Sequence, residues 1–257
     1  MADDESDESH AEIVPGSGDL GAVYAARFEG DPGGELQAWL HIAARREAAI
    51  SKIHRDLLRR SDLANPTSAA TEMTGEVVSL IAHHEDGHRD FIESVLAGAP
   101  FCGRTFAADL MIWLATTEST LLDPLTSRLG AEPDLGHLLS LCSVLERAAR
   151  EPYVHLATLA CALRESGSGR QEPDGLSREL NLNVVEEEVH EQAFREMAIW
   201  ASPAEGAPEL SRRDCAHRLA RLLPRSTIAG DADRARVLTE AGLGELFERE
   251  DLTLSSD

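Results

Sequence analysis

The sequence Glu-Asp-Gly-His at residues 85–88 is matched in pattern by Glu-Glu-Val-His at residues 187–190. Each tetrad reads Glu-x-x-His and lies inside a long stretch whose apolar residues recur at helical spacing. Residues three apart share a face of an α-helix, so each tetrad directs a carboxylate and an imidazole toward one point. Two such helices, with one further Glu from each of two partner helices, form the dinuclear carboxylate site of a four-helix bundle. The pattern therefore predicts a helical bundle with a site for two metal ions inside it.

The rest of the chain also has the spacing of helices. Runs of β-branched residues are short, and aromatic residues make up only 4% of the chain, so we expect an all-α protein. Pro152 falls inside one expected helix and should kink or split it, because proline has no N–H to donate. Helices are predicted over residues 36–60, 69–96, 106–128, 135–165 and 177–200, with two shorter ones over 209–223 and 231–248.

A carboxylate on the first helix can reach the first tetrad. Glu47 lies on the apolar stripe of that helix, 38 residues before Glu85. About 13 residues lead up to the turn and about 16 lead back, so at 1.5 Å per residue both legs are roughly 20 Å long. The two side chains can therefore meet at one level of the bundle.

The remaining carboxylate should come from the helix over 135–165, where two choices compete. Glu146 lies among apolar residues, where a carboxylate without a partner would be costly to bury. Glu151 lies four residues before His155, and a pair at that spacing could also serve the metals. We prefer Glu146 and keep Glu151 and His155 as alternates. Glu118, on the connecting third helix, is a weaker candidate.

The candidate ligands suit iron. Carboxylates are hard oxygen donors that can bridge two cations, and neutral imidazole is a good ligand for iron. Two Fe ions are the expected cofactor, although this ligand set also accepts Mn. We expect His83 and His84 to take surface or supporting roles, and His54 to be an ordinary polar residue. The predicted metal ligands are Glu47, Glu85, His88, Glu146, Glu187 and His190.

The amino-acid composition of the chain argues against two classes of binding partner. The chain of 257 residues has 46 acidic and 24 basic side chains, a formal charge of −22, which argues against nucleic acid and against an anionic membrane surface. Residues 1–34 should form an acidic, largely disordered tail, since the first twelve residues hold six acidic side chains and no Lys or Arg. The four cysteines are scattered, no signal peptide opens the chain, and no apolar run approaches about 18 residues. We expect a cytoplasmic protein.

The two tetrads resemble those of the ferritin-like di-iron carboxylate proteins, and most closely those of the para-aminobenzoate N-oxygenase family. In that family a first-helix Glu is followed by Glu-x-x-His, and a final helix reads His-x-x-x-Glu-x-x-His. Here Glu47, Glu85 and His88 fit the first part, and residues 183–196 look like the final helix. Asn183 stands where the family has a further His. The loss of that nitrogen ligand would change the electronics of the metals and open a coordination position.

This resemblance implies a ferritin-like four-helix bundle with additional helices. The di-metal bundle would span residues 35–201, and C-terminal helices over 202–257 would pack on it. Ala-Gly-Leu at 241–243 is similar to the ending of such proteins. The resemblance also implies an O2-activating non-haem di-iron oxygenase that oxidises a small organic substrate, with amine N-oxygenation in secondary metabolism as a candidate reaction. Such an enzyme needs an external electron donor, and the resemblance suggests a homodimer. The alternative is a non-catalytic ferritin-like protein that binds metal or serves as a partner scaffold.

Overall fold

The computed structural model describes residues 32–98, 127–128, 131, 134–165, 175–222 and 238–252. The predicted disordered tail lies outside these residues except for its last three positions. The predicted helix over 106–128, with Glu118, also lies outside them apart from residues 127–128. The described residues are helical with short connections and include no β-strand. The expected all-α class is therefore confirmed for this part of the chain.

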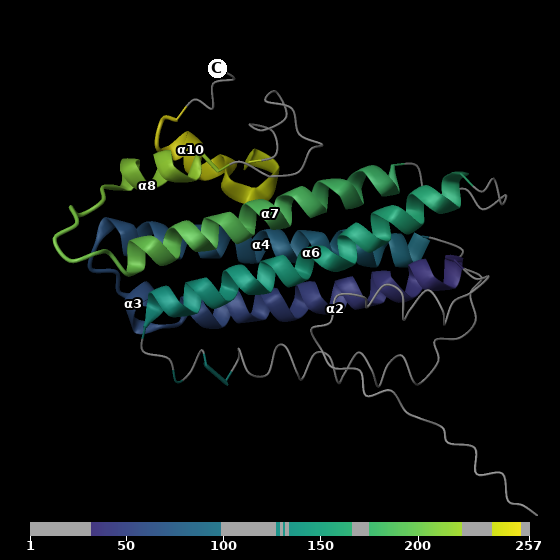
Figure 1. Cartoon of the computed structure of the whole chain (residues 1–257), viewed down its shortest axis with the longest axis horizontal. Coiled ribbons are helices and arrows are strands. Elements are labelled where there is room, and N and C mark those ends of the chain that lie inside the picture. The colour runs from purple at the N-terminus through teal and green to yellow at the C-terminus, as the bar shows by residue number, and fades with distance from the viewer. Residues whose placement is uncertain are drawn as a thin grey trace, which may run out of the picture.

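Four long helices form the body of the molecule (Figure 1). Their limits differ from the predicted ones by only a few residues, because apolar periodicity marks the buried length of each helix. Shorter elements follow the first and last of them: α3 (Ser61–Ala64) after α2, and α8 (Arg212–Leu219) after α7. The long helices are α2 (Pro32–Leu58), α4 (Ala69–Gly98), α6 (Leu135–Glu165) and α7 (Leu176–Ala201).

The long helices pack into a four-membered bundle. Contacts link α2 with α4, α4 with α7, α7 with α6, and α6 with α2. Figure 1 shows that each helix runs antiparallel to both neighbours, so α4 and α6 run in the same direction at opposite corners. The end of α4 and the start of α6 therefore lie at opposite ends of the bundle. This arrangement brings the middle turns of all four helices to one level.

The buried hydrophobic residues form two clusters along the bundle. One contains Leu36, Leu40 and Tyr153, and the other contains Ile50, Ile81 and Phe194. Each fully buried aliphatic or aromatic side chain contributes roughly 1.5–3 kcal/mol to folding. The clusters meet at the level of the two tetrads, so the polar residues there are enclosed from both ends.

Of the two outcomes predicted for Pro152, a kink or a split, the split does not occur: α6 is one helix. Proline cannot donate to the carbonyl four residues earlier, which is that of Ala148. Arg46 of α2 supplies a donor instead, with its Nη1 lying 3.1 Å from the Ala148 oxygen. A guanidinium from the neighbouring helix thus replaces the missing hydrogen bond, and α6 continues through Pro152.

The C-terminal part of the chain packs against α4 and α7. Ser211 caps α8 through a reciprocal pair of hydrogen bonds with Asp214, so this helix begins later than predicted. The predicted helix over 231–248 falls outside the described residues up to 237, and beyond that point it is interrupted. A single wide turn, η1 (Thr239–Leu243), precedes α10 (Gly244–Arg249), and Gly242 breaks the helix with a φ of 82°.

No helix among the described residues combines the length and the apolar character needed to cross a bilayer.

Candidate metal centre

Each of the four long helices places one glutamate at the same level of the bundle. Glu47 comes from α2, Glu85 from α4, Glu146 from α6 and Glu187 from α7, and none is more than 1% exposed. The helical phase of the two tetrads adds His88 and His190, which are 4% and 0% exposed. The structure thus brings all six predicted ligands together in the interior.

The six side chains form two overlapping groups of four. Glu47 and His88 belong to one group and Glu146 and His190 to the other, while Glu85 and Glu187 belong to both. Within each group the potential ligand atoms all lie within 4.8 Å of one another. Two carboxylates common to two groups, with one carboxylate and one imidazole at each end, make the arrangement of a dinuclear site.

The Nδ1 atom of each imidazole faces the carboxylates. His88 Nδ1 lies 3.0 Å from Glu187 Oε1 and 3.6 Å from Glu85 Oε2. His190 Nδ1 lies 2.8 Å from Glu85 Oε1 and 3.8 Å from Glu146 Oε2. Glu85 therefore lies between the two histidines, where a shared ligand of two ions would be needed.

Most of these inward-facing atoms have no hydrogen bond. The buried atoms without one include Oε2 of Glu47, Nδ1 of both histidines, and both carboxylate oxygens of Glu85, Glu146 and Glu187. A buried polar atom without a partner costs about 1–3 kcal/mol, and a charged one costs more. Divalent cations bound by oxygen and nitrogen would satisfy all of them at once, so the residues present fit a pair of metal ions.

The pKa values of the four carboxyl groups show that, without a metal ion, the negative charge of several buried carboxylates is unfavourable. Burial raises the pKa of Glu47 and of Glu146 well above the usual value, and the charge of Glu85 adds to both shifts. Burial and Glu85 also raise the pKa of Glu187 to about 8. Burial would raise the pKa of Glu85 as well, but the close approach of the Glu47 carboxyl and the His190 imidazole holds it well below its usual value. Without a cation, Glu85 is therefore the only one of the four carboxyl groups whose ionised form is favoured by its surroundings.

The histidine pKa values shift in the opposite direction from the effect of burial. The hydrogen bond with Glu186 and the close carboxylates of Glu187 and Glu85 outweigh burial and raise the pKa of His88 well above its usual value. Glu85 and, more weakly, Glu187 do the same for His190. Protons on these groups balance the carboxylate charge in the bare chain. Metal ions would displace those protons.

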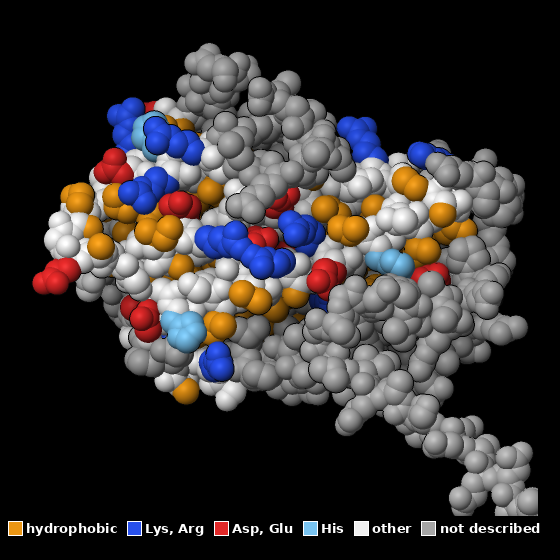
Figure 2. Space-filling model, viewed as in Figure 1, with side chains coloured by type: hydrophobic (Ala, Val, Ile, Leu, Met, Phe, Trp, Pro, Cys, Tyr) orange, Lys and Arg blue, Asp and Glu red, His pale blue; other side chains and the backbone are white. Residues whose placement is uncertain are grey.

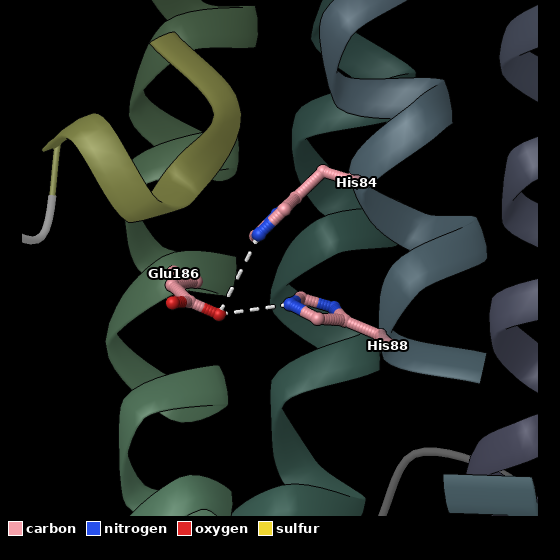
Figure 3. Close-up of side chains that lie close together, drawn as sticks. All are labelled: His84, His88 and Glu186. Carbon is pink, nitrogen blue, oxygen red and sulfur yellow. Dashed lines mark hydrogen bonds and ion pairs between the residues drawn. The ribbon is translucent and has the colours of Figure 1, made fainter. Parts of the chain in front are cut away.

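The other ring nitrogen of His88 and His190, Nε2, also has a hydrogen-bond partner. His88 Nε2 lies 2.9 Å from Glu186 Oε2 on α7, and His190 Nε2 lies 3.2 Å from the carbonyl oxygen of Ala241 in η1. An Nε2–H donated to these acceptors leaves the Nδ1 lone pair free for a metal, which is the usual way a protein orients a metal-binding histidine. Figure 3 shows His88 and its neighbour His84 on α4, both directed toward Glu186.

His84 lies beside the candidate centre and forms, with His88 and Glu186, a further group of possible metal ligands. Its Nδ1 lies 3.2 Å from His190 Nε2, and its Nε2 lies 3.9 Å from Glu186 Oε2. Burial, with the charges of His88 and His190, lowers the pKa of His84 to about 2. His84 is therefore a neutral member of the wall around the candidate centre.

Three residues near the centre were not predicted from the sequence. His54, which we expected to be an ordinary polar residue, is fully buried with Nε2 2.9 Å from Glu146 Oε1. Its position seven residues after Glu47, on the same helix face, was the available signal. Tyr153 donates from its hydroxyl to Glu47 Oε1 at 2.7 Å. Glu186 is the first of three consecutive glutamates, and its role depends on the rotation of α7 relative to α4.

The two alternate ligands lie elsewhere. Glu151 is exposed on the outer side of α6. His155 pairs with Glu35 at 2.9 Å and packs against the ring of Trp39. Neither belongs to the two ligand groups. Asn183, which stands in place of the family's further His, is 6% exposed, and its Nδ2 has no hydrogen bond.

The chain matches no protein-family model, no curated protein and no solved structure in the comparisons made. The site is therefore interpreted from its own geometry.

Proposed function

We propose that this protein is an O2-activating non-haem di-iron oxygenase or oxidase of the ferritin-like kind, acting on a small organic substrate. An arylamine, oxidised at nitrogen, is the first substrate to test. The observation that carries the proposal is the pair of four-ligand groups that share Glu85 and Glu187 inside the bundle. A single-metal site would not need two shared carboxylates or a second histidine at this level.

The chain would contribute ligands, orientation and exclusion of water. Glu47 and His88 would hold one ion, Glu146 and His190 the other, and Glu85 and Glu187 would serve both. When bound, the two iron ions would supply the O2 chemistry. Glu186 and the Ala241 carbonyl would fix the two imidazoles, and Tyr153 would fix Glu47. Hydrophobic clusters at both ends of the layer limit the access of water to it.

The free cysteines support the proposed cytoplasmic location. Cys142, Cys161 and Cys215 form no disulfide. Reduced thiols are typical of a reducing compartment. They do not bear on the reaction.

The direct test is metal content. We expect about two iron ions per chain after anaerobic ferrous loading, measured by elemental analysis. Glu146→Gln should lose much of this iron, whereas Glu151→Gln, which changes an exposed carboxylate on the same helix, should keep it. Equal iron content in the two variants would reject Glu146 as a ligand.

The alternative is a non-catalytic metal-binding or scaffold protein with an incomplete site. A stoichiometry well below two irons per chain would favour it. Two bound irons that consume no O2 after reduction would also favour it, because the proposed oxygenase must react with O2 in its reduced form.

A further inference from the structure

The outer face of α6 and α7 carries a groove in which arginines outnumber glutamates, on a chain whose net charge is negative. The groove has a volume of about 650 Å³, and its lining includes three arginines, two glutamates and an aliphatic side chain: Arg147, Arg150, Arg195, Glu188, Glu191 and Val154. Figure 2 shows the basic side chains gathered over these two helices near the middle of the face, with hydrophobic side chains close by. With a net charge of −22 on the chain, this concentration of arginine is unusual.

The groove has the composition of a protein interface. Its arginines keep between 31% and 50% of their side-chain surface exposed. The exposed large hydrophobic residues among those the structure describes are Val144, Val154 and Ile199, and all three lie on α6 or α7. Arginine together with apolar surface is enriched in protein–protein interfaces. The groove therefore favours a protein partner over a free ion.

The groove lies directly outside the candidate metal centre. Arg147 follows Glu146 in sequence, and the buried glutamates of the groove, Glu188 and Glu191, follow Glu187 and His190. The same helix turns thus carry metal ligands on the inside and the groove on the outside. A partner in the groove would be separated from the centre by about one helix diameter, roughly 10–12 Å.

We propose that this groove is the docking site for a small acidic one-electron carrier protein that reduces the metal centre. The proposal rests on the proposed function, which needs an external electron donor. Each carrier would give up one electron and be oxidised, and two successive carriers would return two ferric ions to the ferrous state. Charge complementarity favours an acidic carrier, because the three arginines of the groove outnumber its two glutamates and give its lining a net positive charge.

A second copy of the chain fits this face less well. A two-fold dimer places the same patch against itself. Because the lining holds three arginines and two glutamates, such a contact would bring together two patches of the same net charge, which is unfavourable. An acidic carrier meets the same arginines with opposite charge.

The test measures binding of an oxidised, acidic [2Fe–2S] ferredoxin to the iron-loaded full chain by calorimetry at low salt. Arg150→Gln removes one charge and leaves the contacts of Glu191 with Arg147 and Arg195 in place. We expect it to weaken binding about threefold, the effect of one exposed charge pair. Val154→Glu should weaken binding about tenfold, because it replaces an apolar contact with a repelling charge.

Lys52→Gln is the matched control. It removes the same charge from an exposed side chain on α2, where Lys52 contacts only Asp56 at 3.1 Å among the ion pairs described. Binding should be unchanged in this variant. All variants should keep their iron and their melting temperature, so that a weaker complex reports on the groove and not on the fold.

Three results would overturn the docking proposal while leaving the proposed function standing, provided that iron is bound. One is absence of ferredoxin binding, and another is an equal loss in Arg150→Gln and Lys52→Gln. The third is a wild-type dimer in sedimentation analysis that dissociates in Val154→Glu, which would assign the face to a second copy. A chain that binds no iron would instead refute the proposed function, whatever the ferredoxin does.

Discussion

Two turns of α7 carry buried carboxylates on opposite sides of the helix, and the carboxylates on the two sides have different partners. On the outer side, Glu191 is 5% exposed and accepts from Arg147 at 2.6 Å and from Arg195 at 2.5 Å. On the inner side, Glu187 is fully buried and meets Glu85 and His88. Among the described residues, no Lys or Arg forms an ion pair with any of the four inner glutamates. Burial of a carboxylate is thus not in itself a sign of a metal. A group of buried carboxylates without a Lys or Arg partner is such a sign.

The largest expected effect separates the two sides directly. Glu187→Gln should lower iron affinity by about 100-fold or more, since an outer partner of a ligand already costs 10–100-fold when lost. Glu191→Gln should leave the affinity within about threefold of wild type, because Glu191 belongs to neither of the two four-ligand groups. Competition with a chelator measures both. An equal loss in both variants would mean that α7 has simply been distorted.

The pH dependence of folding provides the second contrast. The pKa of Glu187 is raised from 4.5 to about 8 in the folded chain. Between these values the folded state holds a proton that the unfolded state has released, so stability decreases as the pH rises through this range. From Glu187 alone, we expect the metal-free protein to lose ~3.5 kcal/mol of unfolding free energy between pH 5 and pH 8.

Urea unfolding at the two pH values measures this loss. Glu187→Gln should reduce it, because the substituted amide does not titrate. The iron-loaded protein should not show it, because the metals hold the carboxylates in the ionised form. A metal-free protein that is more stable at pH 8 than at pH 5 would contradict this picture of the inner carboxylates.

A smaller effect on iron affinity is expected for Glu186, which contacts the ligand His88. Glu186→Gln weakens the acceptor of His88 Nε2 and should lower iron affinity about tenfold. Glu188→Gln, two residues along the same helix, changes a glutamate that lines the outer groove and should leave the affinity unchanged. If Glu188→Gln lowers the affinity as much as Glu186→Gln, the supporting role of Glu186 is wrong.

The smallest effect concerns the C-terminal turn. Gly242 has a φ of 82°, and a Cβ built there would lie 3.5 Å from His84 Cβ and from the Leu80 oxygen. Gly242→Ala should cost about 1 kcal/mol of stability and weaken iron binding slightly, because it moves the Ala241 carbonyl that holds His190. Gly206→Ala has a similar φ of 78° with open space around it. This control should lose comparable stability in thermal unfolding without any loss of iron affinity.

The side chains that converge on the centre could be predicted because the spacing of residues in the sequence determines which of them share a face of a helix. The three-residue spacing of each tetrad selects Glu85 with His88 and Glu187 with His190. The apolar neighbours of Glu146 favoured it over the exposed Glu151, and the structure places Glu146 in the centre.

The supporting contacts could not be predicted, because they depend on how separate segments meet. The Ala241 carbonyl is a backbone atom with no sequence signature, and it reaches His190 only because Gly242 turns the chain there. The contact of Arg46 with Ala148 depends on the spacing of α2 and α6. The choice among three consecutive glutamates for the partner of His88 depends on the rotation of α7 about its axis.

The central claim is that the inner carboxylates hold two metal ions. Anomalous diffraction at the iron absorption edge, from crystals of the iron-loaded protein, tests it most directly. We expect two peaks inside the bundle, one in contact with Glu47 and His88 and the other with Glu146 and His190, with Glu85 and Glu187 between them. A single peak, or peaks only at the surface of a chain whose inner glutamates keep their positions, would contradict it.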